Sequence, residues 1–309
     1  HYAPKSNPLI TRFIPWSTTM KIAAIGEAMI EMSITGDQAQ LGVAGDTLNT
    51  AIYLKRAAPQ IDVDYITRLG RDGFSERIKS FITDQSLGTS AIETDEDRMP
   101  GLYAITTDHH GERSFSYWRD QSAARRLFQL GNSYSFQCLK DYDAVYLSGI
   151  TLAILPPSVG MALLEYLNQS AHILAFDSNY RPALWPDQDT AKHLIAGFWK
   201  RSDLALPSID DEMLLMQESA VAVTDRFIKS GLAGALKRGA EGPVSLGEVV
   251  DQSYLPAQNV VDTTAAGDSF NGAYLAAKFS GASQADALAK GHECARHVVQ
   301  HRGAIAPVM

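Results

Sequence analysis

Residues 260–273 read Val-Val-Asp-Thr-Thr-Ala-Ala-Gly-Asp-Ser-Phe-Asn-Gly-Ala, so that small residues lead from an apolar segment straight into a helical pattern. This pattern predicts a helix over Gly267–Phe279 with little side-chain bulk on its first turn. The first amides of a helix have no partner within the helix, and the helix dipole favours negative charge at that end. We therefore expect the three amides that precede Asp268 to be unpaired and to form an anion hole beside its carboxylate.

Those amides belong to Ala265, Ala266 and Gly267. Together with Asp268 they can supply the two groups that catalysis of phosphoryl transfer needs. The reaction needs a base or positioning group for the attacking hydroxyl, and electrostatic support for the γ-phosphate oxygens. Asp268 can supply the first and the amides the second. The alternative interpretation is an Asp and a Thr that cap an ordinary helix. This segment alone does not distinguish a phosphoryl-transfer site from a capped helix, so other segments of the chain are needed.

From Lys21 onward, short apolar runs alternate with longer helical patterns. This alternation is typical of an α/β fold, in which helices cover both faces of a mostly parallel sheet. The predicted strands are Ile22–Ile25, Val63–Ile66, Ala144–Leu147, Ile173–Phe176, Leu204–Leu206 and Gly234–Leu236. The predicted helices include Leu48–Ala57, Phe74–Gln85, Pro157–Gln169 and Asp210–Gln217. Ligands of such sheets bind at the carboxyl ends of the strands, which is where polar residues are of interest.

One region departs from the alternation. Leu102–Thr107 and Arg113–Arg119 alternate apolar and polar residues around Asp108-His109-His110-Gly111-Glu112, which predicts a β-hairpin with a glycine-containing turn. Met29–Ser33 and Gln40–Val43 can supply two more strands. We thus expect a small lid sheet from residues of about 29–43 and 100–120 beside the main sheet. The two adjacent histidines of the turn have no evident third ligand, so they are predicted to be solvated.

Composition restricts the classes of protein to consider. The chain has 27 Lys and Arg against 35 Asp and Glu, which argues against a surface built for nucleic acid or anionic lipid. No apolar run approaches the roughly 18 residues of a membrane-spanning helix, and the N-terminus lacks a signal-peptide pattern. The only cysteines, Cys138 and Cys294, form no metal-ligand pattern, which suits a reducing compartment. We expect a cytoplasmic protein.

The first 19 residues carry three prolines and no periodic pattern, and the chain begins with His1. Met20 is the expected start of a single folded domain that spans 20–309. Residues 1–19 can be a cloning remnant, an upstream extension or an ordered arm, and their sequence predicts no element of the fold.

Residues 262–268, Asp-Thr-Thr-Ala-Ala-Gly-Asp, resemble the signature D-T-x-G-A-G-D of the ribokinase-like, or PfkB, family of carbohydrate kinases, whose last Asp is the catalytic base. The resemblance extends over nearly the whole chain from Met20. It implies a three-layer α/β/α fold with a β-sheet lid, ATP and Mg²⁺, and a homodimer or higher homo-oligomer formed through the lid. Dependence on a monovalent cation stays open. Because Ala265 replaces a glycine of the signature, we expect the backbone there to avoid positive φ.

A second part of the resemblance lies near the N-terminus. Residues 42–51, Gly-Val-Ala-Gly-Asp-Thr-Leu-Asn-Thr-Ala, are similar to the family's Gly-Gly loop, which is followed by an Asn on the first helix. This implies that Gly45 lets the backbone approach the sugar, and that Asp46 and Asn49 bind its hydroxyls, as does Asp268. Taken alone, the segment is equally well a glycine turn with Asp46 as N-cap.

Two further segments resemble the family's nucleotide and metal motifs. Residues 237–242, Lys-Arg-Gly-Ala-Glu-Gly, imply ATP contacts from Lys237, Gly239 and Gly242; a plain β-turn is the alternative. Residues 208–212, Ser-Ile-Asp-Asp-Glu, stand where the family has N-x-x-E, which helps to order magnesium. The resemblance implies Ser208 near ATP and an indirect metal role for Asp211 or Glu212, although the usual Asn is Ser208. An acidic helix N-terminus is the alternative.

The predicted hairpin and one loop address the choice of sugar. Phe115, Tyr117 and Arg119 fall on one face of their strand by the period of two, and Tyr103 lies on the partner strand. Arg181 follows a strand at the ligand-binding edge of the main sheet. Two arginines can clamp a carboxylate, which a planar guanidinium pairs with well. The alternative is that both form surface ion pairs.

Several short phrases are most similar to the branch of the family that phosphorylates 2-keto-3-deoxy-D-gluconate on its 6-hydroxyl, and Ala265 also resembles that branch. The phrases are Gly101-Leu102-Tyr103, Tyr117-Trp118-Arg119, Tyr146-Leu147-Ser148-Gly149-Ile150, Asn179-Tyr180-Arg181-Pro182 and 262–268. The resemblance implies Tyr103, Tyr117, Arg119 and Arg181 as contacts of the sugar acid. Preference between gluconate- and galactonate-derived acids stays open.

Three other functions are alternatives to a kinase for this sugar acid. A kinase for ribose, fructose or a nucleoside is the nearest alternative, although the two arginines favour an acid. A non-catalytic sugar- or nucleotide-binding regulator is disfavoured by the presence of Asp268. A NAD-dependent dehydrogenase is disfavoured because no G-x-G-x-x-G follows the first strand, where only Gly26 occurs.

Overall fold

The computed structural model describes residues 20–107 and 113–308. Within these residues, the centre is a seven-stranded sheet of order β15-β14-β13-β12-β11-β1-β4, whose strands are parallel except for β15, which is antiparallel to β14. The strands are β1 (Lys21–Ile25), β4 (Asp62–Ile66), β11 (Ala144–Ser148), β12 (Ile173–Asp177), β13 (Leu204–Ala205), β14 (Gly234–Leu236) and β15 (Val244–Leu246). The prediction of a mostly parallel sheet is confirmed.

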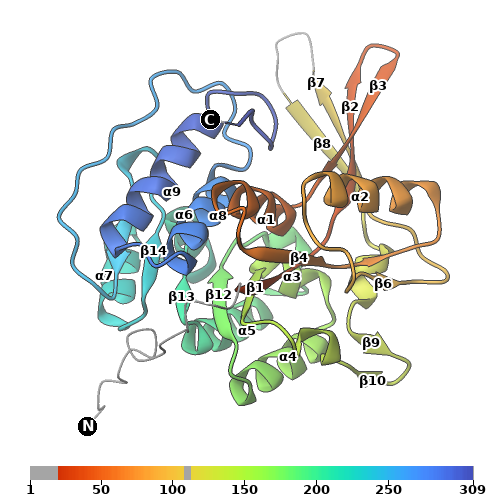
Figure 1. Ribbon diagram of the computed structural model, residues 1–309, viewed down its shortest axis with the longest axis horizontal. Coiled ribbons are helices and arrows are strands. Elements are labelled where there is room, and N and C mark those ends of the chain that lie inside the picture. The colour runs from red at the N-terminus through yellow and green to blue at the C-terminus, as the bar shows by residue number, and fades with distance from the viewer. Residues whose placement is uncertain (1–19, 108–112, 309) are drawn as a thin grey trace.

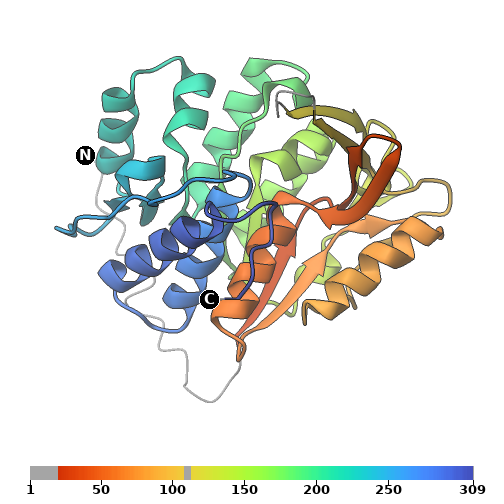
Figure 2. The same ribbon diagram turned by 90° about the horizontal axis from the view of Figure 1, so that it is seen from above.

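Helices cover both faces of this sheet (Figures 1 and 2). On one face lie α1 (Asp46–Ala57), α2 (Gly73–Asp84), α8 (Ala266–Phe279) and α9 (Gln284–Val298). On the other lie α3 (Gly149–Ile154), α4 (Pro157–Gln169), α5 (Gln188–Arg201), α6 (Ile209–Met216) and α7 (Ala220–Lys229). Strand β1 is apolar after Lys21 because both of its faces are buried. Ile22 and Ala24 pack in the core on one side of the sheet, and Ala23 and Ile25 pack in the core on the other side. None of the described helices is long and apolar enough to span a membrane.

A four-stranded sheet of order β3-β2-β7-β8 projects from this body (Figure 1). Its strands are β2 (Met29–Thr35), β3 (Gln38–Ala44), β7 (Leu102–Thr107) and β8 (Arg113–Trp118). Strand β2 pairs with β7 in parallel, which joins two antiparallel pairs into the predicted lid sheet. The turn predicted at 108–112, with His109 and His110, lies outside the described residues, as does the segment 1–19.

Short elements connect these layers. They are β5 (Arg68–Leu69), β6 (Glu93–Thr94), β9 (Gln129–Leu130), β10 (Ser133–Tyr134) and the 3₁₀ turns η2 (Ala123–Arg126), η3 (Gln137–Leu139), η4 (Pro182–Leu184) and η5 (Gly239–Glu241).

Helices α1 and α8 approach each other closely at Gly272. A side-chain carbon added there would lie 2.6 Å from the carbonyl oxygen of Thr50 and 2.6 Å from Cβ of Tyr53. No real side chain fits at such distances, so glycine permits the contact between the two backbones. The contact brings the first turns of both helices together at the carboxyl edge of the sheet.

Candidate active site

Asp268 lies in the first turn of α8 and faces Asn49 on α1. Its Oδ2 accepts a 2.9 Å hydrogen bond from Nδ2 of Asn49. Burial, followed by the negative charge of Asp46, raises the pKa of Asp268 to about 8, although the Asn49 bond and the charge of Lys237 oppose that rise. A carboxyl group in this range can exchange a proton near neutral pH. Oδ1 of Asn49 is buried and has no hydrogen-bond partner among the described residues.

Asp46 begins α1 and is held in place by two side chains from neighbouring strand ends. Its Oδ2 accepts hydrogen bonds from Oγ of Ser148 at 2.5 Å and from Nδ2 of Asn179 at 2.7 Å. Asn179 has a φ of 27°, a region that non-glycine residues rarely adopt. The preceding Gly45 lies against the backbone, since an added Cβ would be 2.3 Å from the carbonyl oxygen of Glu27. Gly45, Asp46 and the Asn49–Asp268 pair thus share one edge of the sheet.

A second cluster surrounds Lys237, which follows β14. Its Nζ lies 2.7 Å from Oδ2 of Asp177 and 3.1 Å from Oδ1 of Asn271. Nδ2 of Asn271 donates to the same Asp177 oxygen at 2.6 Å. A side-chain carbon on Gly267 would be 3.7 Å from Nζ of Lys237, so the ammonium group lies beside the first turn of α8. This cluster of Asp177, Lys237 and Asn271 was not predicted as a unit.

The loop before α8 differs from the prediction in its backbone. Ala265 has φ 60° and ψ 17°, in the left-handed region, so the expectation that it avoids positive φ is wrong. The side chain of Asp262 anchors the loop that contains Ala265. Its Oδ1 accepts from the amide of Thr264 at 3.0 Å and from its Oγ1 at 2.6 Å, and its Oδ2 accepts from the amide of Gly303 at 3.0 Å. These bonds offset a left-handed alanine, which costs roughly 1–2 kcal/mol.

The amides of the predicted anion hole are only partly free. The amide of Ala266 donates to the carbonyl oxygen of Thr263 at 3.2 Å, so the expectation that all three amides are unpaired is wrong for Ala266. Those of Ala265 and Gly267 make no hydrogen bond within the described part of the chain. Two amides at the positive end of α8 therefore stay available to an anion.

The residues predicted to contact ATP lie around the same strand end. Ser208 precedes α6, and the adjacent amide of Ile209 donates to the carbonyl oxygen of Lys237 at 2.9 Å. Gly239 and Gly242 have φ values of 57° and 79°, which glycine adopts without strain. An added Cβ at Gly242 would be 2.5 Å from the ring of Tyr254. The turn therefore requires its glycines.

The two candidate metal residues have different surroundings. Glu212 is 1% exposed and binds Nη2 of Arg226 at 3.0 Å and Nε1 of Trp199 at 3.2 Å, so it belongs to the core under α6. Asp211 is half-buried and pairs with Nη1 of Arg181 at 2.9 Å. Burial raises the pKa of the Asp211 carboxyl, and Arg181 opposes this rise. The described residues contain no group of three His, Cys, Asp or Glu side chains that could hold a metal.

Both arginines of the predicted clamp are ion-paired. Nε of Arg119 lies 2.9 Å from Oε2 of Glu27, and Nη2 contacts the same oxygen. The pair is buried, at 7% and 2% exposure, and Oε1 of Glu27 has no hydrogen-bond partner among the described residues. Arg181 is half exposed and binds Asp211 and the carbonyl oxygen of Tyr180. The sequence left open that both arginines form surface ion pairs. Arg181 does form one, whereas the ion pair of Arg119 lies in the interior.

The aromatic face of the lid matches the predicted alternation. Tyr103 on β7 is directly opposite Tyr117 on β8, and their rings stack at a centroid distance of 5.5 Å. Tyr103 is buried, and its hydroxyl contacts Oε2 of Glu31. Tyr117 and Phe115 are exposed at 55% and 47%. The lid therefore presents an aromatic surface next to the strand that leads to Arg119.

Sequence reasoning missed Glu27, the partner of Arg119. Its position was still visible, because Glu27 is a charged residue that comes two positions after the first apolar strand, at the carboxyl end of a parallel sheet. Asp177, which ends β12, and Asn179, two residues later, were expected at this edge from the sequence, and the structure brings both to the site.

Comparisons with known proteins agree with this geometry. Residues 18–309 match the model of a family described as pfkB family carbohydrate kinase. The 2-dehydro-3-deoxygluconokinase of Dickeya dadantii is 40% identical over 304 residues, which cover 94% of this chain and 98% of that protein. The 2-dehydro-3-deoxygluconokinase of Escherichia coli K12 is 39% identical over 304 residues, with 93% and 97% covered.

Solved structures show the same fold at low sequence identity. The 2-dehydro-3-deoxygluconokinase of Thermotoga maritima superimposes with a TM-score of 0.77 at 18% identity, covering 93% of this chain and 96% of that one. A fructokinase of Xylella fastidiosa with bound ATP gives a TM-score of 0.75 at 19% identity, covering 92% and 93%.

Proposed function

This chain belongs to the PfkB family of carbohydrate kinases, and on that premise we propose that it transfers the γ-phosphate of ATP to the 6-hydroxyl of 2-dehydro-3-deoxy-D-gluconate. Two relatives about 40% identical over almost their whole length carry the name of that activity. The observation that carries the proposal is the position of Asp268. Its carboxyl accepts a hydrogen bond from Asn49, which is among the predicted sugar contacts, and Lys237 lies beside Gly267 in the same helical turn.

In the proposed reaction, Asp268 accepts the proton of the 6-hydroxyl while the oxygen attacks the γ-phosphorus. The new phosphorus–oxygen bond forms as the bond to the ADP oxygen breaks. The amides of Ala265 and Gly267 and the ammonium of Lys237 stabilise the negative charge on the transferred group. Asn49 orients Asp268 through Nδ2, and its unpartnered Oδ1 can accept a hydrogen bond from a substrate hydroxyl.

The site fits magnesium that is held mainly by nucleotide phosphates. Mg²⁺ commonly binds through one or two carboxylates together with substrate phosphates and water, which does not require a three-carboxylate cage. Asp211 is the candidate for such an indirect contact, because Glu212 is already paired with Arg226 in the core. When bound, the ion would neutralise part of the phosphate charge.

We assign the carboxylate of the substrate to Arg119 and Arg181. A guanidinium has five N–H groups, so each arginine keeps donors beyond those used by Glu27, Asp211 and Tyr180. Glu27 fixes the plane of the Arg119 guanidinium, which favours a planar, bidentate contact. Tyr103 and Tyr117 would cover the sugar chain from the lid.

A substrate panel tests the proposal. ADP formation is measured by a coupled assay with 2-dehydro-3-deoxy-D-gluconate, its galactonate-derived epimer, fructose and ribose. We expect the sugar acid to give the highest kcat/KM by at least about 100-fold over the neutral sugars, because the latter lack the carboxylate that the remaining N–H donors of Arg119 and Arg181 would bind. Equal or higher activity with fructose or ribose would show a different PfkB kinase.

The assembly and the cellular location of the protein are also proposals. We propose that it is a homo-oligomer assembled through the lid, where Trp118, on the face opposite Tyr117, is 60% exposed. Its location in the cytoplasm remains an expectation from the sequence.

A further inference from the structure

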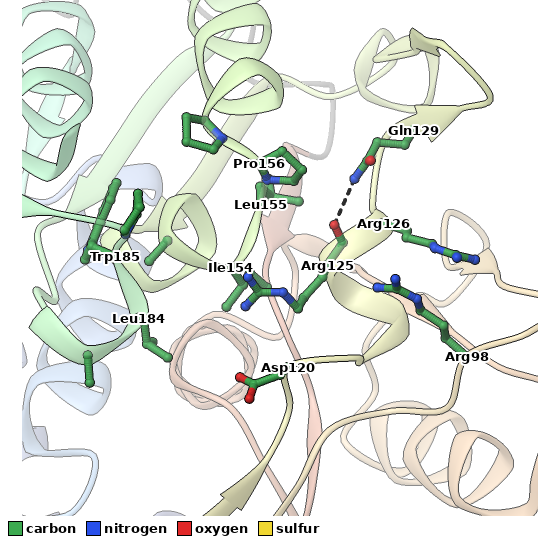
Figure 3. A pocket seen from close by; sticks show the side chains of 14 residues that line it. Arg98, Asp120, Arg125, Arg126, Gln129, Ile154, Leu155, Pro156, Leu184 and Trp185 are labelled. Carbon is green, nitrogen blue, oxygen red and sulfur yellow. Dashed lines mark hydrogen bonds between the residues drawn. The ribbon is translucent and has the colours of Figure 1, made fainter.

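A cavity of about 500 Å³ lies outside the candidate active site (Figure 3). It is bounded by the segment after the lid, the junction of α3 and α4, and η4. Its lining residues include Arg98, Asp120, Arg125, Arg126, Gln129, Ile154, Leu155, Pro156, Leu184 and Trp185. None of them is a residue of the candidate active site, although Asp120 follows Arg119 in sequence. A volume of this size is within the range of about 300–1,000 Å³ for small-molecule sites.

Three arginines give the cavity its charge. Arg126 is tied to Oδ1 of Asp95 at 3.2 Å and to Oδ2 of Asp97 at 3.4 Å. The guanidinium groups of Arg98 and Arg125 make no hydrogen bond or ion pair with any described residue, although both side chains are half-buried. Figure 3 shows Arg125 extending toward the wall of Ile154 and Leu184. Neither guanidinium group has a partner to displace within the described part of the chain, and both line the cavity, so an anion there can pair with both.

The opposite wall is apolar but carries two polar groups. The indole Nε1 of Trp185 is buried and has no hydrogen-bond partner among the described residues. Asp120 is exposed and can accept a hydrogen bond from a hydroxyl group. A ligand that satisfies all these groups has an anionic end for the arginines, hydroxyls for Asp120, and carbon surface for Ile154 and Leu184.

We propose that this cavity binds a small phosphorylated sugar, with its phosphate on Arg98 and Arg125 and its hydroxyls toward Asp120 and Trp185. A phosphate monoester carries close to two negative charges at neutral pH, which matches two unpaired guanidinium groups, and its oxygens accept bidentate contacts. A neutral sugar would leave both arginines unpaired. The site does not depend on which sugar the kinase phosphorylates.

Calorimetric titration tests the proposal with glucose 6-phosphate, inorganic phosphate and glucose as probes on the full chain. The sugar acid and a non-hydrolysable ATP analogue are present throughout to occupy the active site. We expect glucose 6-phosphate to bind more tightly than inorganic phosphate, and glucose not to bind. The double variant Arg98→Ala/Arg125→Ala should weaken glucose 6-phosphate binding by at least about tenfold, since charge-assisted hydrogen bonds are lost. Arg71→Ala, which breaks the surface pair with Glu96, is the matched control and should bind as the wild type does.

Kinase activity of the variants shows whether they are folded. If the double variant loses activity, the single variant Arg125→Gln replaces it, because glutamine keeps length and polarity while removing the charge. Failure of glucose 6-phosphate to bind the wild type, or equal binding to wild type and the charge-removing variant, would overturn the proposal. Binding of inorganic phosphate alone would overturn the assignment of a sugar phosphate.

Discussion

Nδ2 of Asn49 donates a 2.9 Å hydrogen bond to Oδ2 of Asp268, across 219 residues of sequence. The bond fixes one oxygen of the proposed base, so that a substrate hydroxyl is presented with the other. Because Asn49 lies on α1 and Asp268 on α8, the relation between sugar and base depends on how these two helices pack.

Asp268→Asn should remove the base while retaining the shape of the site. We expect kcat to fall by about 10²–10⁴-fold, since this is the usual contribution of a general base. Binding of the sugar acid should change little, because the amide oxygen can still accept from Asn49. Steady-state kinetics and calorimetric titration with the sugar acid measure the two effects. A variant with nearly unchanged kcat would remove Asp268 from the role of base.

The raised pKa of Asp268 predicts a rising pH profile. The carboxyl group is neutral below its pKa of about 8 and can accept a proton only above it, so kcat/KM should increase with pH and level off beyond that value. Asp46→Asn removes a negative charge that raises this pKa, and should move the rising limb to lower pH. The profile is measured over pH 6 to 10 for both proteins. If kcat/KM rose at the same pH in the wild type and in Asp46→Asn, the charge of Asp46 would not influence the pKa of Asp268.

Lys237→Met should affect both catalysis and stability. The variant loses a cation beside the first turn of α8, so kcat should fall and KM for ATP should rise. It also leaves the buried Asp177 carboxylate without its ammonium partner, which should lower the free energy of unfolding by about 3 kcal/mol. Denaturant unfolding measures the second effect.

The double variant Lys237→Met/Asp177→Asn separates these two roles of Lys237. We expect it to recover most of the lost stability, because the unpaired charge is gone, but none of the activity. If stability did not recover, the loss in Lys237→Met would have a cause other than the unpaired buried charge of Asp177.

Arg181→Ala tests the contact with the substrate carboxylate. Arg181 is exposed, so its removal should leave the fold intact, while KM for the sugar acid should rise by about tenfold or more. KM for ATP is the internal control and should stay within about twofold. Equal increases in both constants would show that Arg181 acts through Asp211 rather than on the sugar acid.

The left-handed backbone of Ala265 leads to a stability prediction. Glycine adopts this φ without strain, so Ala265→Gly should raise the free energy of unfolding by about 0.5–1 kcal/mol after the loss of chain entropy is subtracted. Ala266→Gly is the matched control, since Ala266 starts the helix and glycine there should destabilise. Thermal unfolding of both variants gives the sign of each change. Destabilisation in both would show that packing of the Ala265 methyl group stabilises the fold by more than the left-handed backbone destabilises it.

Local patterns were enough to predict the layers of the fold. The four predicted residues of β1, Ile22–Ile25, are buried on both faces, so each of them is apolar, and a run of this kind can be recognised in the sequence. The lid strands could be predicted for the opposite reason, because one of their faces is solvated and the sequence alternates.

Contacts between distant residues could not be predicted in the same way. Arg119 and Glu27 are 92 residues apart, and Lys237 and Asp177 are 60 residues apart. Their pairing depends on the order of the strands in the sheet, because that order decides which strand ends are neighbours. A local sequence pattern does not contain the strand order. Ala265 shows a further difficulty, because its left-handed backbone, which costs roughly 1–2 kcal/mol, is adopted within a loop that Asp262 anchors through residues on either side.

The close crossing of α1 and α8 at Gly272 has a consequence for synthesis of the protein. The buried side of α1 is covered by a helix that follows roughly 220 residues later, so α1 leaves the ribosome long before its partner. At about 5–20 residues per second, this interval is on the order of 10–45 s. During that time α1 can pack on β1 and β4, which share its core, but its side toward α8 has no partner. The contact between α1 and α8, and with it the Asn49–Asp268 pair, can therefore form only when synthesis of the chain is nearly complete.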